Sequence, residues 1–101
     1  MFEGKRHLTR GVQAGIGIDL QLLMWSMIDA WKSQGKELDY LQCFELSIER
    51  VNGKSVQTIK HHQEISRRKE EGLYRIEEPI SGEVWCIDSE EYCMMLLPSE
   101  Y

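Results

Sequence analysis

The sequence lacks the long apolar runs, repeats and low-complexity segments that mark several classes of protein. No apolar stretch approaches the roughly 18 residues needed to cross a bilayer, so we expect no membrane partner. The segment Met1–Arg6 lacks the apolar region and small-residue cleavage site of a secretory signal. These absences favour one soluble domain over residues 1–101, located in the cytoplasm.

Cysteine is scarce and its spacing is irregular. The three cysteines, Cys43, Cys86 and Cys93, form no C-x-x-C pair. An odd number without close spacing argues against a disulfide framework and fits a reducing compartment. Structural zinc sites usually draw two ligands from a tight knuckle, which is missing here, and free cysteine is among the most buried residues. We therefore expect the thiols to pack in the core, and we expect neither a metal nor a cofactor.

Positive charge is sparse in the C-terminal third. The chain has a net charge of −5, yet residues 1–35 and 36–70 each sum to +1. Residues 71–101 carry one basic and eight acidic side chains and sum to −7. Such a segment repels phosphate and attracts basic groups, although a solvated acidic face is the commoner explanation. Nucleic-acid binding is not favoured, and the glycine-rich stretch Gly11–Gly17 lacks the spacing of nucleotide-binding loops.

Residues 19–34 carry the signals of one amphipathic helix. Asp19 is suited to cap its start, and Gly35 supplies a stop. Six apolar side chains form one stripe on the helical wheel, while Leu22 and Trp25 lie on the polar side. This second pair needs either a partner protein or cover from another part of the chain. The stripe consists of Leu20, Leu23, Met24, Met27, Ile28 and Trp31.

A β-hairpin is predicted within residues 38–65, because Asn52–Gly53 is the strongest two-residue turn signal. This turn places Val51 opposite Lys54 and fixes every other pair. One face then carries alternating apolar residues and becomes the core face, and the other faces solvent. The core-face pairs are Ile48–Gln57, Leu46–Ile59 and Phe44–His61, and the other pairs are Ser47–Thr58, Glu45–Lys60 and Cys43–His62.

The remaining segments complete an α+β pattern. Residues 6–12 form a short strand or an extended arm, and Arg67–Gly72 is a charged connector before a short strand at Tyr74–Ile76. Val84–Ile87 and Tyr92–Leu97 form a second hairpin. Strand, helix, hairpin and hairpin in this order predict one amphipathic helix packed on a mainly antiparallel sheet.

Polar residues that can bind a small ligand gather near the end of the second hairpin strand. His61, His62 and Glu64 lie together there, and Arg10 adds positive charge near the N-terminus. The alternation along the strand places His61 on the core face. A histidine at such a position is more often a buried residue with a hydrogen-bond partner than a ligand-binding residue. Cys43 lies opposite His62, but a thiol beside an imidazole indicates catalysis only when an oriented base and an oxyanion hole accompany it.

Five segments carry a resemblance to a known family. They are residues 9–12 (TRGV), 19–25 (DLQLLMW), 37–42 (ELDYLQ), 62–64 (HQE) and 96–101 (LLPSEY). Through them the chain resembles the uncharacterised domain-of-unknown-function family 960 of Gram-positive bacteria. The resemblance implies a small bacterial cytoplasmic protein and assigns no activity or catalytic residue. Arg67–Gly72 and the cysteines lie outside that pattern.

Two classes of function fit these observations. The leading hypothesis is a non-enzymatic protein-binding or regulatory module that binds a protein partner or forms a homo-oligomer. Its contacts are Leu22, Trp25 and the edge at Met94 and Met95, although two-sided burial explains the apolar run Met94–Leu97 equally well.

The alternative is a small-ligand-binding domain or an undescribed enzyme with a polar pocket between helix and sheet. A pocket with convergent polar groups favours this alternative, and a flat apolar patch favours the first hypothesis. The candidate ligand-binding residues are Arg10, His61, His62 and Glu64.

Overall fold

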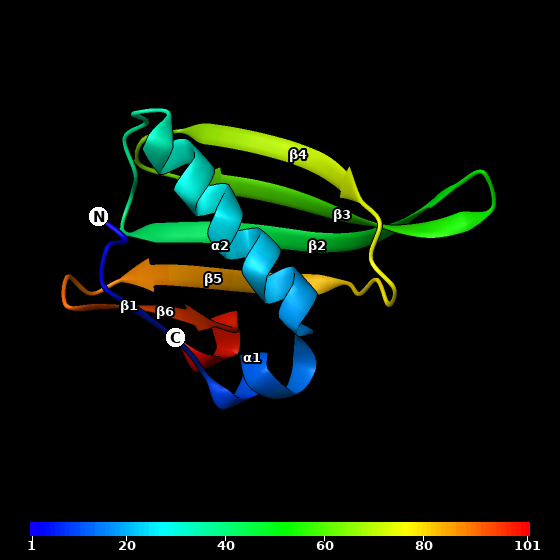
Figure 1. Ribbon diagram of the computed structural model, residues 1–101, viewed down its shortest axis with the longest axis horizontal. Helices are drawn as coiled ribbons and strands as arrows, with labels where there is room; N and C mark the ends of the chain where they lie inside the picture. Colours follow the sequence, from blue (N-terminus) through cyan, green and yellow to red (C-terminus); the bar gives the residue numbers. More distant parts are fainter.

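The protein has an α+β fold in which one long helix lies diagonally across one face of a six-stranded sheet (Figure 1). A computed structural model describes residues 1–101. The molecule measures 43 × 29 × 20 Å, and the shortest dimension holds one sheet and one helix layer. The helices are α1 (Arg10–Gly15), α2 (Ile18–Ser33) and the 3₁₀ turn η1 (Pro98–Glu100). No helix is both long and apolar enough to cross a membrane.

The sheet has the strand order β1-β6-β5-β2-β3-β4 and is mainly antiparallel. The exception is the pair β1 and β6, which is parallel. The expected second hairpin, β5 and β6, is confirmed. The strands are β1 (Lys5–Leu8), β2 (Leu41–Val51), β3 (Lys54–Gln63), β4 (Arg68–Tyr74), β5 (Gly82–Asp88) and β6 (Tyr92–Leu96).

The register expected for the β2–β3 hairpin is confirmed at every pair from Val51–Lys54 to Cys43–His62. Asn52 and Gly53 both have positive φ, 52° and 78°, as a type I′ turn requires. β5 pairs with β2 only as far as Leu46, and β4 pairs with β3 only as far as Gln57. The end of the hairpin therefore projects from the sheet as a two-stranded arm (Figure 1).

The start of α2 differs from the prediction. Its N-cap is Gly17, which offers no side-chain hydrogen bond, and Asp19 lies inside the first turn. The Asp19 carboxylate still lies near the positive end of the helix dipole. The prediction that Asp19 caps the helix is therefore wrong, but its acidic character suits the place it occupies.

The end of α2 is as predicted. Gly35 has a φ of 72°, and its amide donates to the carbonyl of Lys32 at 3.1 Å. The Lys36 amide donates to the carbonyl of Trp31 at 3.0 Å. These two bonds form the Schellman arrangement, which satisfies carbonyl groups at the helix end.

Three segments differ from the predicted pattern. Most of the predicted connector Arg67–Gly72 belongs to the edge strand β4, which continues to Tyr74 and whose charged side chains are typical of an unpaired edge. Arg75 and Ile76, predicted as part of a short strand, lie outside it. The glycine-rich stretch contains α1, capped by Thr9, whose hydroxyl accepts from the Val12 amide at 3.3 Å. The short strand β1 pairs with the last strand of the chain, which local sequence cannot specify.

The hydrophobic core lies between α2 and the sheet. The α2 stripe supplies Met24, Ile28 and Trp31, all with 0% exposure. The sheet supplies alternate residues of each central strand, as a one-sided core requires. These residues are Phe44 and Leu46 of β2, Ile59 of β3, Val84 and Cys86 of β5, and Cys93 and Met95 of β6.

Candidate functional site

The four candidate ligand-binding residues do not converge on one pocket. Arg10 is exposed on α1, which packs against β6 near one edge of the sheet, far from β3 in the strand order. His62 and Glu64 lie on the other side, at the end of β3, where both line one surface cavity. His61, the neighbour of His62, faces away from this cavity into the core.

His61 is completely buried between two aromatic rings. Its ring stacks on Trp31 of α2 at a centroid distance of 3.7 Å and on Phe44 of β2 at 4.4 Å. The space between helix and sheet is filled at this position, so the expected polar pocket is not found at His61. Alternation along β3 correctly predicted that His61 faces the core.

A buried amide network fixes the protonation of His61. The Gln42 side-chain nitrogen donates to the Asp39 carbonyl at 2.9 Å and to the Gln63 side-chain oxygen at 2.7 Å. Its oxygen is therefore the acceptor for the Nε2–H of His61, 2.8 Å away. Burial lowers the pKa of His61 to about 3, with a smaller contribution from His62. His61 is thus a neutral core residue at physiological pH.

The same network fixes the turn between β3 and β4. The Asp39 carboxylate accepts hydrogen bonds from the amides of Ile65 at 2.7 Å and Ser66 at 3.0 Å. The Gln63 amide group donates to the carbonyls of Glu37 at 2.8 Å and Ser66 at 2.6 Å. The connection after α2 and the β3–β4 turn are therefore joined by buried polar groups.

The cysteines are buried and not bonded to one another. Burial, with smaller contributions from neighbouring carboxylates, raises the pKa of the Cys43 thiol to about 11. A thiol of this kind is protonated at neutral pH and is a poor nucleophile. The His62 Nε2 lies 3.2 Å from a Glu45 oxygen, so its partner is a carboxylate. No group of three or more His, Cys, Asp or Glu side chains is placed to hold a metal ion.

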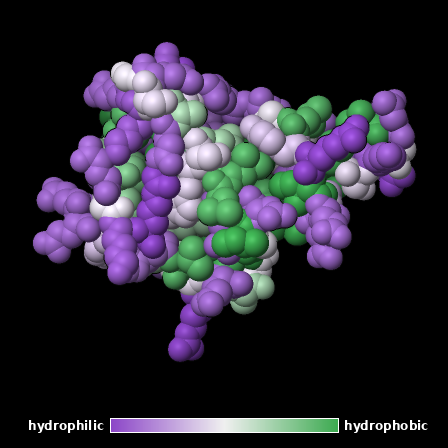
Figure 2. All heavy atoms as spheres, in the orientation of Figure 1, coloured by the Kyte–Doolittle hydropathy of each residue, from purple (hydrophilic) through white to green (hydrophobic).

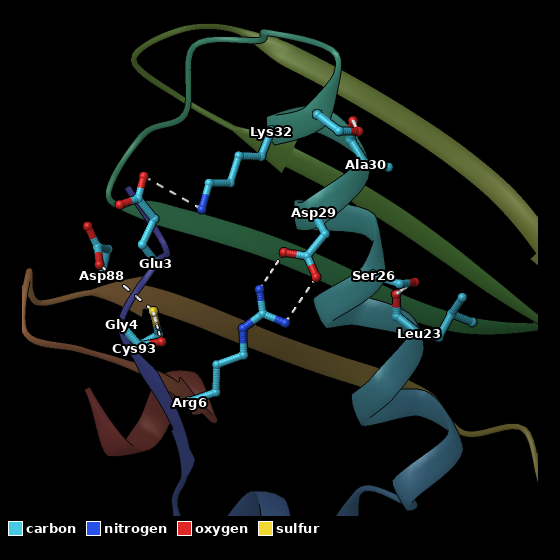
Figure 3. A network of polar contacts seen from close by, with 11 residues as sticks. Glu3, Gly4, Arg6, Leu23, Ser26, Asp29, Ala30, Lys32, Asp88 and Cys93 are labelled. Atoms are coloured by element: carbon cyan, nitrogen blue, oxygen red, sulfur yellow. Dashed lines mark hydrogen bonds and ion pairs between the residues drawn. The ribbon is translucent and has the colours of Figure 1, made fainter.

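Trp25 is covered by its own chain. It is 6% exposed, and the Arg6 guanidinium lies 4.8 Å from the centre of its ring. Arg6 is held there by Asp29 of α2, to which its Nη1 donates at 3.0 Å (Figure 3). Leu22 is 62% exposed. The two apolar residues on the polar side of the helix therefore differ: Trp25 lies under Arg6 of β1, and Leu22 is exposed to solvent.

Met94 and Met95 lie on opposite faces of the sheet. Met95 is fully buried in the core under α2. Met94 is half-buried on the other face, beside Ile87 of β5 in the register. Met95 is therefore a core residue, and of the two methionines only Met94 is accessible to a partner.

The sheet face opposite α2, here called the open face, carries an apolar strip. Core residues alternate with strip residues along β5, so Trp85 points away from α2. The C-terminus covers part of this face, where Tyr101 packs edge-on against Trp85 with ring centroids 5.4 Å apart. The Tyr101 hydroxyl lies 3.2 Å from that of Tyr40. The strip consists of Leu41, Trp85, Ile87 and Met94, which are half-buried, and of Cys43 and Leu96, which are 4% and 3% exposed; the exposed Tyr40 and Tyr101 flank it.

Beside this strip is an acidic hollow of about 410 Å³. Glu45 of β2 and Glu83 of β5 lie directly opposite each other in the register, and Glu71 of β4 also lines the hollow. Lys60 is its one basic residue. Like charges directly opposite each other destabilise a sheet. The pair cannot be predicted from the sequence, because the β2–β5 register is set by a long connection without a turn signal.

The fold and these surfaces define a class of protein: a small α+β domain with one sheet face under a helix and the other largely open. The chain belongs to the family described as "Staphylococcal protein of unknown function (DUF960)", whose profile matches residues 5–100. The family predicted from the sequence motifs is thus confirmed.

A solved structure has a similar fold. It is described as "Crystal structure of the protein of unknown function from Enterococcus faecalis". The TM-score is 0.75 at 23% identity, and the match covers 97% of this chain and 91% of that one. The comparison with curated proteins gives no match.

Proposed function

We propose that this protein is a non-enzymatic protein-binding module whose open face docks a partner carrying basic side chains beside apolar ones. The observation that carries the proposal is the apolar strip around Trp85, which lies next to the acidic hollow on a face that no helix layer covers. Trp and Tyr are enriched at the centres of protein interfaces, where they dominate the binding energy. The strip offers Trp85, Tyr40 and Tyr101 in one place.

The acidic hollow specifies the partner's charge. Glu45 and Glu83 repel each other across the β2–β5 pair, and the Glu83 carboxylate is oriented by a hydrogen bond from the Trp85 indole at 2.7 Å. A lysine or arginine side chain seated between the two carboxylates offsets this repulsion. A second copy of the chain brings the same carboxylates to the contact, so a basic partner is favoured over self-association.

The opposite side of the molecule offers a weaker candidate. Leu22 and Ile18 lie one turn apart on α2 and are each 62% exposed. Apolar atoms on this side lie near the N-terminal half of α2 and along the arm (Figure 2). Single exposed apolar pairs are common on monomeric proteins, so the proposal rests on the open face.

The test is affinity capture from the cytosol of the source organism with matched charge variants. Glu45→Lys with Glu83→Lys should remove a specific partner from the eluate. Glu49→Lys with Glu70→Lys makes the same charge change at exposed positions outside the hollow and should keep it. Circular dichroism checks that both variants fold.

The proposal fails if the hollow variant retains the partner as well as the control does. It also fails if light scattering shows that wild type is a dimer and that Trp85→Glu is a monomer, because the open face is then the contact between two copies of this chain.

A further inference from the structure

A second, oppositely charged surface surrounds the β3–β4 turn, where two cavities of about 520 and 440 Å³ adjoin. Arg67 and Arg68 line both, together with Gln63. Lys69 lines the larger cavity and Lys36 lines the smaller one. Four cations therefore lie around one pair of cavities on a chain whose net charge is −5.

The N–H groups of these four side chains are not paired with any carboxylate of the protein. No carboxylate oxygen lies within 4.0 Å of Lys36, Arg67, Arg68 or Lys69, whereas Arg6 is paired with a carboxylate. Each cavity is lined by three of the four cations and by one carboxylate. The carboxylate is Glu64 in the larger cavity and Glu37 in the smaller one. His62 also lines the larger cavity.

Arg68 is held in place by aromatic packing. The carbon of its guanidinium lies 5.2 Å from the centre of the Trp31 ring, which itself stacks on His61. The Nε atom of Arg68 is buried and has no hydrogen-bond partner. A guanidinium positioned in this way loses little side-chain entropy when an anion binds.

The backbone of the turn is fixed as well. The Asp39 carboxylate holds the amides of Ile65 and Ser66, and the Gln63 side chain holds the Ser66 carbonyl. Arg67 follows directly after these anchored residues. The buried amide network thus supports a rigid platform for the cations, which is the condition for strong binding of a small ligand.

We infer that the β3–β4 turn binds a small ligand with two linked phosphate groups. Arg67 and Arg68 lie between the two groups, Lys36 contacts one of them, and Lys69 contacts the other. The guanidinium fork matches the geometry of phosphate oxygens. Ile65 is the one apolar residue of either lining, so neither cavity offers an apolar slot that buries a nucleobase. The site therefore recognises the phosphates alone.

Calorimetric titration of the whole protein with inorganic pyrophosphate at fixed ionic strength tests the inference. Arg67→Gln with Lys69→Gln should weaken binding about tenfold or more, because each residue supplies a charge-assisted hydrogen bond. Both side chains are exposed and make no polar contact, so the variant should fold. Lys54→Gln with Arg75→Gln removes the same charge away from the cavities and should bind as wild type does.

The ligand series identifies what is recognised. Pyrophosphate should bind more tightly than inorganic phosphate, and a nucleoside diphosphate should bind no more tightly than pyrophosphate. Amide NMR shifts should concentrate in residues 64–69. Equal weakening in both charge variants overturns the inference, as does an absence of saturable binding. A nucleoside diphosphate that binds tenfold more tightly than pyrophosphate overturns the claim that phosphates alone are read.

Discussion

His61 should make the stability of this protein fall as the pH drops below about 6.5. It is fully buried, and its pKa is lowered to about 3 from the ordinary value of 6.5. In the unfolded chain the imidazole binds a proton below about pH 6.5, whereas in the folded protein it stays neutral. The unfolded state therefore gains protons that the folded state cannot take up, and stability falls with decreasing pH.

The size of the effect follows from the shift. Each pH unit below 6.5 costs roughly 1.4 kcal/mol until the folded pKa is approached. Between pH 7 and pH 4.5 the loss due to His61 is therefore roughly 2 to 3 kcal/mol. This is a large share of the 5 to 15 kcal/mol that usually stabilises a domain.

The assay is urea unfolding of wild type and His61→Phe at several pH values. Phenylalanine keeps the stack between Trp31 and Phe44 but leaves the Gln42 oxygen without a donor, which costs roughly 1 to 3 kcal/mol at pH 7. The variant should nevertheless lose 2 to 3 kcal/mol less than wild type on acidification, because nothing titrates at position 61. Equal losses in the two proteins refute the reasoning. An imidazole NMR signal of folded His61 that titrates near pH 6.5 refutes it as well.

Five further variants test the packing. In denaturant melts, Leu46→Ala should destabilise the domain by roughly 2 to 4 kcal/mol, because Leu46 faces α2. Lys60→Ala, on the other face of the sheet, should cost less than about 1 kcal/mol. Equal losses in the two variants contradict the assignment of these residues to opposite faces. Gly35→Ala should lower stability by about 1 kcal/mol, because φ is 72° there; an unchanged melting temperature contradicts the Schellman arrangement. Circular dichroism should show that Trp25→Glu unfolds the chain, since Arg6 and the core cover Trp25, while Leu22→Glu should change the free energy of unfolding by less than about 0.5 kcal/mol. A folded, monomeric Trp25→Glu variant would show that Trp25 is not part of the core.

The hairpin was predictable because one local signal specifies it. Asn52–Gly53 fixes the turn, and the turn fixes the register as far as Cys43–His62. The α2 stripe was predictable for the same reason, since helical period and Gly35 are both local. The inward direction of His61 followed from alternation alone.

The elements that the sequence does not predict depend on distant partners. β4 looks like a connector because an edge strand carries charges, and only its pairing with β3 reveals it. β1 covers Trp25 because it pairs with β6, more than 80 residues away along the chain. The open face was missed for the same reason: the strip and the opposed pair Glu45 and Glu83 exist only once β5 lies beside β2.

Site-specific photo-crosslinking tests the open face most directly. A benzophenone amino acid replaces Tyr101, which is 64% exposed and packs on Trp85, or replaces Ser33, which is exposed on the α2 side. In the cytosol of the source organism, the probe at Tyr101 should give one discrete adduct, and Glu45→Lys with Glu83→Lys should abolish it. The probe at Ser33 should give none. Adducts of equal yield from both positions, or an adduct at Tyr101 that survives the charge reversal, contradict docking on the open face.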